Sequence, residues 1–104
     1  MSADDDLLQV AAEGDLVRVV DALQRGASVF AGDENNSTAL WLAARFGHVQ
    51  IVDLLLANGA DPYQENEFRH TPLTISSEYG KTEVVKRLLA AGSEVDHTTK
   101  SLSY

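Results

Sequence analysis

The chain has 104 residues, enough for one domain, and its 44% hydrophobic content excludes a disordered acidic tail. Sixteen acidic residues against eight Lys and Arg leave a formal net charge of -8, which disfavours binding to nucleic acid or to an anionic membrane surface. The chain has no cysteine, so disulfides, thiolate metal sites and a cysteine nucleophile are excluded. We expect no cofactor.

The first predicted helix pair begins close to the N-terminus. Asp4, Asp5 and Asp6 lie at the start of its first helix, where negative charge suits the positive end of the helix dipole. We expect Asp5 to take the N-cap position. Gly14 separates this helix from a second one, which is expected to end at Gly26.

The same pattern returns in the middle of the chain, after a period of about 33 residues. Thr38 lies at the expected N-cap of a helix, Gly47 separates this helix from the next, and Gly59 ends the pair. Apolar residues between these points keep the i, i+3, i+4 spacing of helices: Leu40, Ala43 and Ala44, then Ile51, Val52, Leu55 and Leu56. The middle unit is therefore predicted to be helix, turn and helix.

A third unit follows after one more period of the same length. Thr71 is its predicted N-cap, and Pro72 occupies the first helical position, where a missing N–H does no harm. Gly80 and Gly92 are expected to end its two helices. The three glycine pairs keep one period, which predicts a stack of repeated helix pairs.

Two segments of the middle unit carry a recognisable pattern: Thr38 to Gly47 reads TALWLAARFG, and Val52 to Asp61 reads VDLLLANGAD. They resemble the ankyrin repeat, whose pattern is T-P-L-H-x-A-A-x-x-G followed by V-V-x-x-L-L-x-x-G-A-D. The resemblance covers residues 5–98 and implies an all-α repeat solenoid of helix-turn-helix units joined by short hairpin loops. The expected single domain, 1–104, divides into repeats at about 3–33, 34–66 and 67–98 and a C-terminal tail at 99–104.

The sequence departs from the family pattern at several positions. Trp41 occupies the family's histidine position, and we expect it to be buried between units, with a part in partner binding as the alternative. Asn36 and Arg69 stand where the family has a hairpin glycine, and because arginine tolerates the left-handed conformation poorly, the second hairpin is expected to be deformed. Ser76 and Ser77 replace the family's alanine pair and are predicted to face the core.

The two ends of the predicted stack differ. Charged residues cover the first unit, as a capping repeat requires, whereas residues 98–104 are expected to run through a further hairpin. Either the natural chain continues beyond them or this tail acts as the cap. We expect a monomer; the alternative is self-assembly, in which the face of 82–91 stacks on or swaps with another copy.

No spacing of residues predicts a catalytic site or a metal site. His48 follows the turn glycine of the middle unit, where packing or turn hydrogen bonding explains it. His70 and His97 lie in the expected hairpins and show no ligand spacing. We therefore predict that the protein is not an enzyme and binds no metal.

The resemblance implies a binding surface on the concave face of the stack, where hairpin tips and the first helices are exposed. Carried over by register, the partner-binding residues are Glu34, Asn35, Ser37, Arg45, Phe46, Glu67, Phe68, His70, Glu78 and Tyr79. Phe46, Phe68 and Tyr79 are the expected apolar anchors. For Phe46 and Tyr79 the alternative is that both fold down as partial core.

These observations predict a protein-protein interaction module whose partner peptide or domain is basic, with apolar groups that contact the aromatic residues. The alternative function is a self-assembling or regulatory repeat domain, or the N-terminal piece of a larger protein. We expect a cytoplasmic location, with the nucleus as the alternative.

Overall fold

The computed structural model describes the backbone of residues 2–103 and the side chains of residues 2–92. Within this backbone the chain forms helices and no strand; an isolated antiparallel bridge joins Gly32 and Thr38. The helices in chain order are α1 (Ala3–Glu13), α2 (Leu16–Gln24), α3 (Ala39–Phe46), α4 (Val49–Ala57), α5 (Pro72–Glu78) and α6 (Thr82–Ser103). None of the described helices is both long and apolar enough to cross a membrane.

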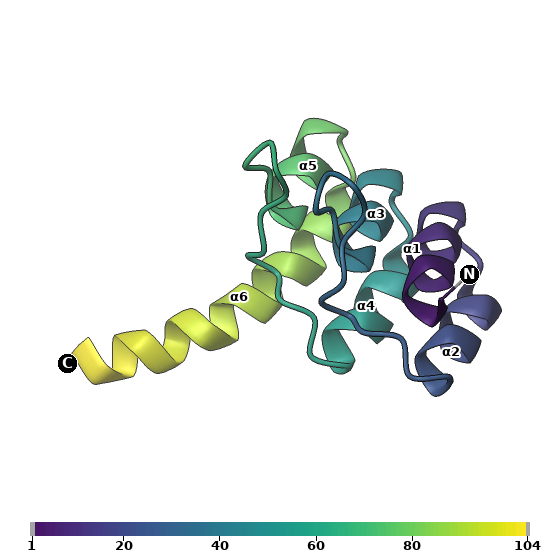
Figure 1. Ribbon diagram of the computed structural model, residues 1–104. Coiled ribbons are helices and arrows are strands. Elements are labelled where there is room, and N and C mark those ends of the chain that lie inside the picture. Colours follow the sequence, from purple (N-terminus) through teal and green to yellow (C-terminus); the bar gives the residue numbers. More distant parts are fainter. Residues whose placement is uncertain (1, 104) are drawn as a thin grey trace.

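The helices stack as pairs in two rows. Helices α1, α3 and α5 form one row and α2, α4 and α6 form the other, with consecutive members of each row in contact (Figure 1). Each unit therefore buries its apolar side against its neighbour and not in one central core. The prediction of an all-α repeat solenoid is confirmed.

The predicted caps of the middle and third units are confirmed. The side chain of Thr38 accepts a hydrogen bond from the backbone N–H of Trp41, and that of Thr71 accepts one from Thr74. Gly14 and Gly47 end α1 and α3 in the left-handed conformation, with φ of 83° and 79°. A residue without Cβ adopts this conformation freely, so the period of the glycines sets the period of the turns.

The N-cap of α1 is Ser2, so the prediction that Asp5 takes this position is wrong. The hydroxyl of Ser2 accepts a hydrogen bond from the N–H of Asp5, and α1 begins at Ala3. Serine is a strong N-cap, and the three aspartates then fill the first turn, where their charges suit the dipole. Asp4 also accepts a hydrogen bond from the N–H of Ser28 at 2.7 Å, which ties the start of α1 to the loop after α2.

The core is a line of small contacts through the stack. Its fully buried large side chains include Leu7, Leu40, Ile51 and Leu55. Ala43 and Ala44 are also fully buried, which lets α3 approach its neighbours closely. In the third unit Ser76 is buried as predicted, whereas Ser77 is exposed, because no further helix pair packs on that side of α5 in the described structure.

The two hairpins share one geometry. The N–H of Asp33 donates to the carbonyl of Ser37 at 3.0 Å, and the N–H of Asn66 donates to that of His70 at 3.0 Å. Asn36 and Arg69 are both left-handed, with φ of 61° and 64°. The predicted deformation at Arg69 is therefore wrong: because the hydrogen bonds of the hairpin fix its shape, the arginine adopts the conformation that a glycine would take.

Replacing Arg69 by glycine should raise the free energy of unfolding by about 0.5 to 1 kcal/mol. The left-handed conformation costs a side chain with a Cβ about 1 to 2 kcal/mol, and the greater freedom of glycine in the unfolded chain offsets part of the gain. Urea denaturation followed by circular dichroism measures the change. Asn36→Gly is the control and should gain less, since asparagine tolerates this conformation; a destabilised Arg69→Gly variant would contradict the prediction.

Helix α6 continues through Gly92, so the prediction that this glycine ends the helix is wrong. Gly26 and Gly59 are left-handed, with φ of 94° and 91°, whereas Gly92 is helical. A side chain at Gly92 would collide with the hydroxyl of Tyr63, so the glycine here permits a close approach.

The segment predicted to form a further hairpin, 98–104, is helical as far as Ser103. Its side chains, and that of His97, lie outside the described residues. At the start of α6, Arg87 forms ion pairs with Asp53 of α4 and with Glu83. The hydrogen bond to Asp53 raises the pKa of Arg87 above its ordinary value, and the pair joins the last two units of the second row.

Candidate interaction surface

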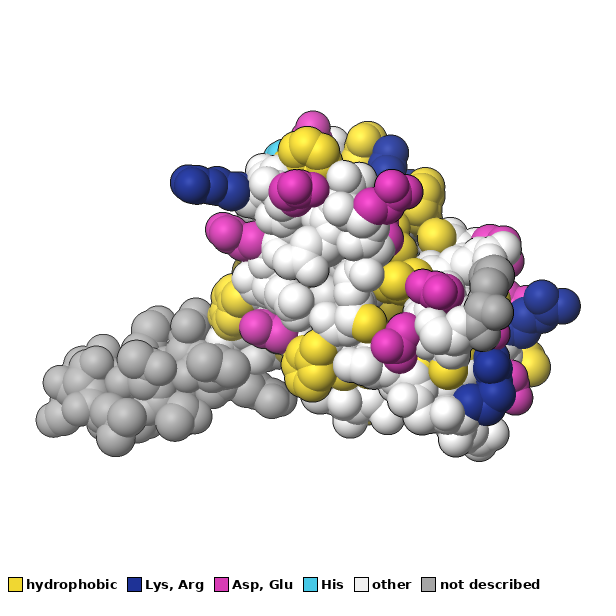
Figure 2. Space-filling model, viewed as in Figure 1, with side chains coloured by type: hydrophobic (Ala, Val, Ile, Leu, Met, Phe, Trp, Pro, Cys, Tyr) yellow, Lys and Arg dark blue, Asp and Glu magenta, His cyan; other side chains and the backbone are white. Residues whose placement is uncertain are grey.

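The hairpins and the first helices of the units line two adjoining depressions, which together we call the groove. The first, of about 390 Å³, lies between the middle and third units, and the second, of about 440 Å³, lies between the first and middle units. Asp33 and Leu42 line both. Figure 2 shows acidic and hydrophobic side chains next to one another on the described part of the surface.

The first depression brings together most of the residues predicted to bind a partner. Those that line it are Asn35, Ser37, Arg45, Phe68, His70, Glu78 and Tyr79. Phe46 lies beside it, in a smaller depression with Arg45, Tyr79 and Lys81. Glu34 lines the second depression, and Glu67 lies in the second hairpin, where its N–H donates to the carbonyl of Asn35 at 2.8 Å. That bond joins the two hairpins.

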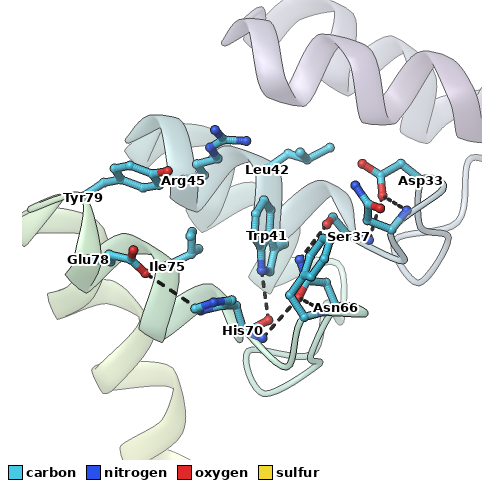
Figure 3. A pocket seen from close by; sticks show the side chains of 12 residues that line it. Asp33, Ser37, Trp41, Leu42, Arg45, Asn66, His70, Ile75, Glu78 and Tyr79 are labelled. Carbon is cyan, nitrogen blue, oxygen red and sulfur yellow. Dashed lines mark hydrogen bonds and ion pairs between the residues drawn. The ribbon is translucent and has the colours of Figure 1, made fainter.

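Trp41 lies at the floor of the first depression. Its side chain is only 7% exposed, and its Nε1–H donates to the carbonyl of His70 at 2.9 Å (Figure 3). The prediction that Trp41 is buried between units is confirmed. The indole therefore links the first helix of the middle unit to the hairpin of the next unit and holds that hairpin in place.

Asn66 and Ser37 connect the two hairpins from below. The amide nitrogen of Asn66 donates to the hydroxyl of Ser37 at 3.1 Å, and its oxygen accepts from the N–H groups of Phe68 and His70. Ser37 is 2% exposed, so its side chain positions the hairpin instead of presenting a surface. The sequence prediction missed Asn66, although Asp33 lies one period earlier and makes equivalent bonds.

Arg45 lies between two aromatic rings. Its Cζ atom is 5.1 Å from the centre of the Phe46 ring and 5.5 Å from that of the Tyr79 ring. Contacts of this kind attract the guanidinium to the ring faces. Phe46 and Tyr79 are 44% and 49% exposed, so the alternative that they form partial core is wrong. They lie on adjacent units, as predicted, with the arginine between them.

The outer edge of the first depression is polar and aromatic. Phe68, at the tip of the second hairpin, is exposed. Nδ1 of His70 lies 4.0 Å from Oε2 of Glu78, and Figure 3 shows both side chains below Arg45 and Tyr79. An exposed ring thus lies across the depression from the rings that flank Arg45.

The second depression has an apolar floor and an acidic rim. Leu8, Ala12 and Leu42 contribute the apolar side chains, and the carboxylates belong to Asp5, Asp33 and Glu34. The sequence prediction missed Asp5, Leu8 and Leu42 as part of this surface. The signal was available for Leu42, because Gln9, Leu42 and Ile75 occupy equivalent positions of the three units and all three line the groove.

The described residues provide a contact surface and no metal-binding cluster. No group of three or more His, Cys, Asp or Glu side chains within it is placed to hold a metal ion. Packing explains the position of His48: its Nε2 lies 3.0 Å from the carbonyl oxygen of Ala12, and its ring lies against Gly14.

Comparison with known proteins identifies the repeat. A family model described as ankyrin repeats, in three copies, matches residues 7–99, nearly the whole chain. A search of curated proteins finds no match.

Proposed function

Because the chain belongs to the ankyrin repeat family, whose members are generally protein-protein interaction modules, we propose that the groove binds a basic protein segment with apolar anchors. The observation that carries this proposal is the pair of half-exposed rings, Phe46 and Tyr79, that both lie close to the guanidinium of Arg45. No residue is assigned a catalytic role.

The rings have the properties of interface anchors. Aromatic side chains provide a large contact area and have few rotatable bonds, so little conformational entropy is lost when a partner covers them. Both rings lie within cation–π distance of Arg45, an attraction that favours this arrangement. Phe68 supplies a third ring from the hairpin tip.

The acidic residues support a basic partner. Asp5, Glu34 and Glu67 are exposed on or beside the groove, and the whole chain carries a formal charge of -8. A field of one sign raises the rate at which a partner of opposite sign associates and disfavours acidic competitors. The contacts we propose are Glu34, Asn35, Arg45, Phe46, Glu67, Phe68, His70, Glu78 and Tyr79, with Ser37 beneath them in a positioning role.

The test selects peptides from a random library displayed on phage and then measures their affinity for the purified chain by calorimetry. The selected peptides should carry net positive charge and at least one large apolar residue. The double variant Phe46→Ala/Tyr79→Ala should weaken binding by about 2 kcal/mol, roughly 30-fold in Kd. Phe30→Ala is the matched control, because Phe30 is also an exposed ring and lines neither the groove nor the smaller depression beside it that contains Phe46.

Three outcomes would contradict the proposal. A double variant with unchanged affinity would place the binding surface elsewhere. A double variant with reduced helical content would show that the rings are needed for folding. Failure to select any peptide that competes for the groove would remove the proposed function itself.

Self-assembly through the face of 82–91 stays the alternative prediction. Leu89 on this face is 50% exposed, whereas Leu56, its equivalent in the middle unit, is partly buried. The groove is preferred because its residues combine anchors and charge, while the described end face offers isolated apolar groups.

A further inference from the structure

We propose that Arg45 binds a carboxylate of the partner, so that the partner segment carries one acidic residue among its basic and apolar ones. This inference rests on the proposed function and assigns a chemistry to one position within it. Arg45 lies where the first depression meets the aromatic pair, with Leu42 of the second depression one helical turn away.

Three of the four other arginines have acidic partners, and Arg69 in the second hairpin has none among the side chains of residues 2–92. Arg18 pairs with Asp15, Arg25 with Asp6 and Asp21, and Arg87 with Asp53 and Glu83. Among the side chains of residues 2–92, no carboxylate lies within ion-pair distance of Arg45. Its only described contacts beyond its own helix are with an aromatic ring, so its hydrogen-bonding capacity is unused.

Glu78, the acidic residue expected to pair with Arg45, interacts with another residue instead. Glu78 is the equivalent of Arg45 in the next unit, and the two charges are opposite. An oxygen of the Glu78 carboxylate lies instead 4.0 Å from Nδ1 of His70, and Figure 3 shows both side chains below Arg45. Arg45 and Glu78 thus present a positive and a negative group to the same depression.

Stacking prepares Arg45 for a planar anion. The Cζ atom of Arg45 lies 5.1 and 5.5 Å from the two ring centres, and the N–H donors of a guanidinium lie in the plane of the group, where a ligand can reach them. A carboxylate can accept two of these donors side by side, the strongest arrangement for this pair. Since the rings restrict the side chain before binding, less entropy is lost when the carboxylate arrives.

A carboxylate also fits the charge around the site better than a phosphate does. Glu78 lines the first depression with Arg45, Glu34 lines the second depression, and the net charge of -8 repels a dianion more strongly than a single negative charge. A neighbouring Lys or Arg of the same segment would lie over Leu8 and Leu42, with its head among the carboxylates of the second depression. The partner segment therefore has a basic part and an acidic residue about one helical turn apart.

The test repeats the peptide selection with Arg45→Gln. Peptides selected by the wild-type chain should share a position enriched in Asp or Glu, and this enrichment should disappear with the variant. Lys86→Gln is the matched control for net charge, because Lys86 is exposed on α6 in the other row of helices. It should select the same acidic position as the wild type.

A double-mutant cycle then measures the interaction between Arg45 and the acidic residue of a selected peptide. Replacing the acidic residue of a selected peptide by its amide should weaken binding to the wild-type chain roughly tenfold and leave binding to Arg45→Gln nearly unchanged. Arg45→Lys, which keeps the charge but cannot form the planar two-bond contact, should show an intermediate effect.

The results distinguish a failure of this inference from a failure of the proposed function. Peptides that depend on Phe46 and Tyr79 but show no acidic position, or keep it with Arg45→Gln, would overturn the inference and leave the proposed function intact. If no peptide binds the groove, the proposed function fails and the inference fails with it.

Discussion

Replacing Leu40 by alanine should lower the free energy of unfolding by about 3 kcal/mol, a large part of the stability expected for a domain of this size. Leu40 is fully buried, and its helix, α3, contacts α1, α4 and α5. Removing its side chain leaves a cavity that these three helices cannot all close. The loss combines the apolar area returned to water with the weaker dispersion attraction among the atoms around the cavity.

Leu73→Ala is the matched control, since Leu73 occupies the same position in the third unit. Leu73 packs on the core but is only partly buried, because the main neighbours of α5 are α3 and α6, whereas α3 packs on three helices. We expect a loss of about 1 to 2 kcal/mol. Urea denaturation followed by circular dichroism measures both variants, and equal losses would mean that the middle unit is no better packed than the third.

The period of the sequence predicts most of the fold because backbone geometry repeats with it. A glycine is favoured where φ is positive, a threonine caps where a helix begins, and apolar residues keep helical spacing where a neighbour covers them. Thr38, Gly14 and Gly47 meet these conditions and are found where the sequence places them. These requirements are local, so local sequence is sufficient to find them.

The errors arise where contacts that the repeat pattern does not specify decide a local choice. Arg69 is left-handed because the hydrogen bonds of its hairpin outweigh its own preference. Ser2 caps α1 in the place expected of Asp5, and the N–H of Ser28 donates to Asp4 within the same unit. Gly92 stays helical against the ring of Tyr63, almost a full repeat earlier, and this contact joins two units.

The candidate site likewise combines positions that the repeat predicts with contacts that it does not predict. Register alone places Phe46 and Tyr79 on adjacent units of one surface, because equivalent positions of a repeat lie side by side. The position of Arg45 between the rings depends on which rotamer it adopts among several neighbours. The bond between Asn66 and Ser37 likewise joins two units and follows from no motif within either.

Replacing Gly14 by alanine should lower the free energy of unfolding by about 2 to 3 kcal/mol, for two separate reasons. At φ of 83° an added Cβ is strained, which costs about 1 kcal/mol. The Cβ would also lie 2.6 Å from Cε1 and 2.8 Å from Nδ1 of His48, so the ring must move. Moving it disturbs the contact between its Nε2 and the carbonyl of Ala12, at about 1 to 2 kcal/mol.

Gly26→Ala separates the two reasons. Gly26 is equally left-handed, with φ of 94°, but no atom lies within 4 Å of the position its Cβ would occupy. This variant should therefore lose only about 1 kcal/mol, the backbone part. Chemical denaturation of both variants gives the difference directly, and equal losses would show that the His48 ring moves aside without effect.

Combining Gly14→Ala with His48→Ala tests the contact itself. If the ring is what the new methyl group meets, the methyl group should cost only about 1 kcal/mol once the ring is absent, with a coupling of about 1 to 2 kcal/mol between the two substitutions. Gly47 provides a comparison one unit along, where the added Cβ would meet Cδ of Lys81 at 2.9 Å. Because that flexible chain can swing away, Gly47→Ala should resemble Gly26→Ala, and the large loss at Gly14 then belongs to the rigid histidine that joins the first two units.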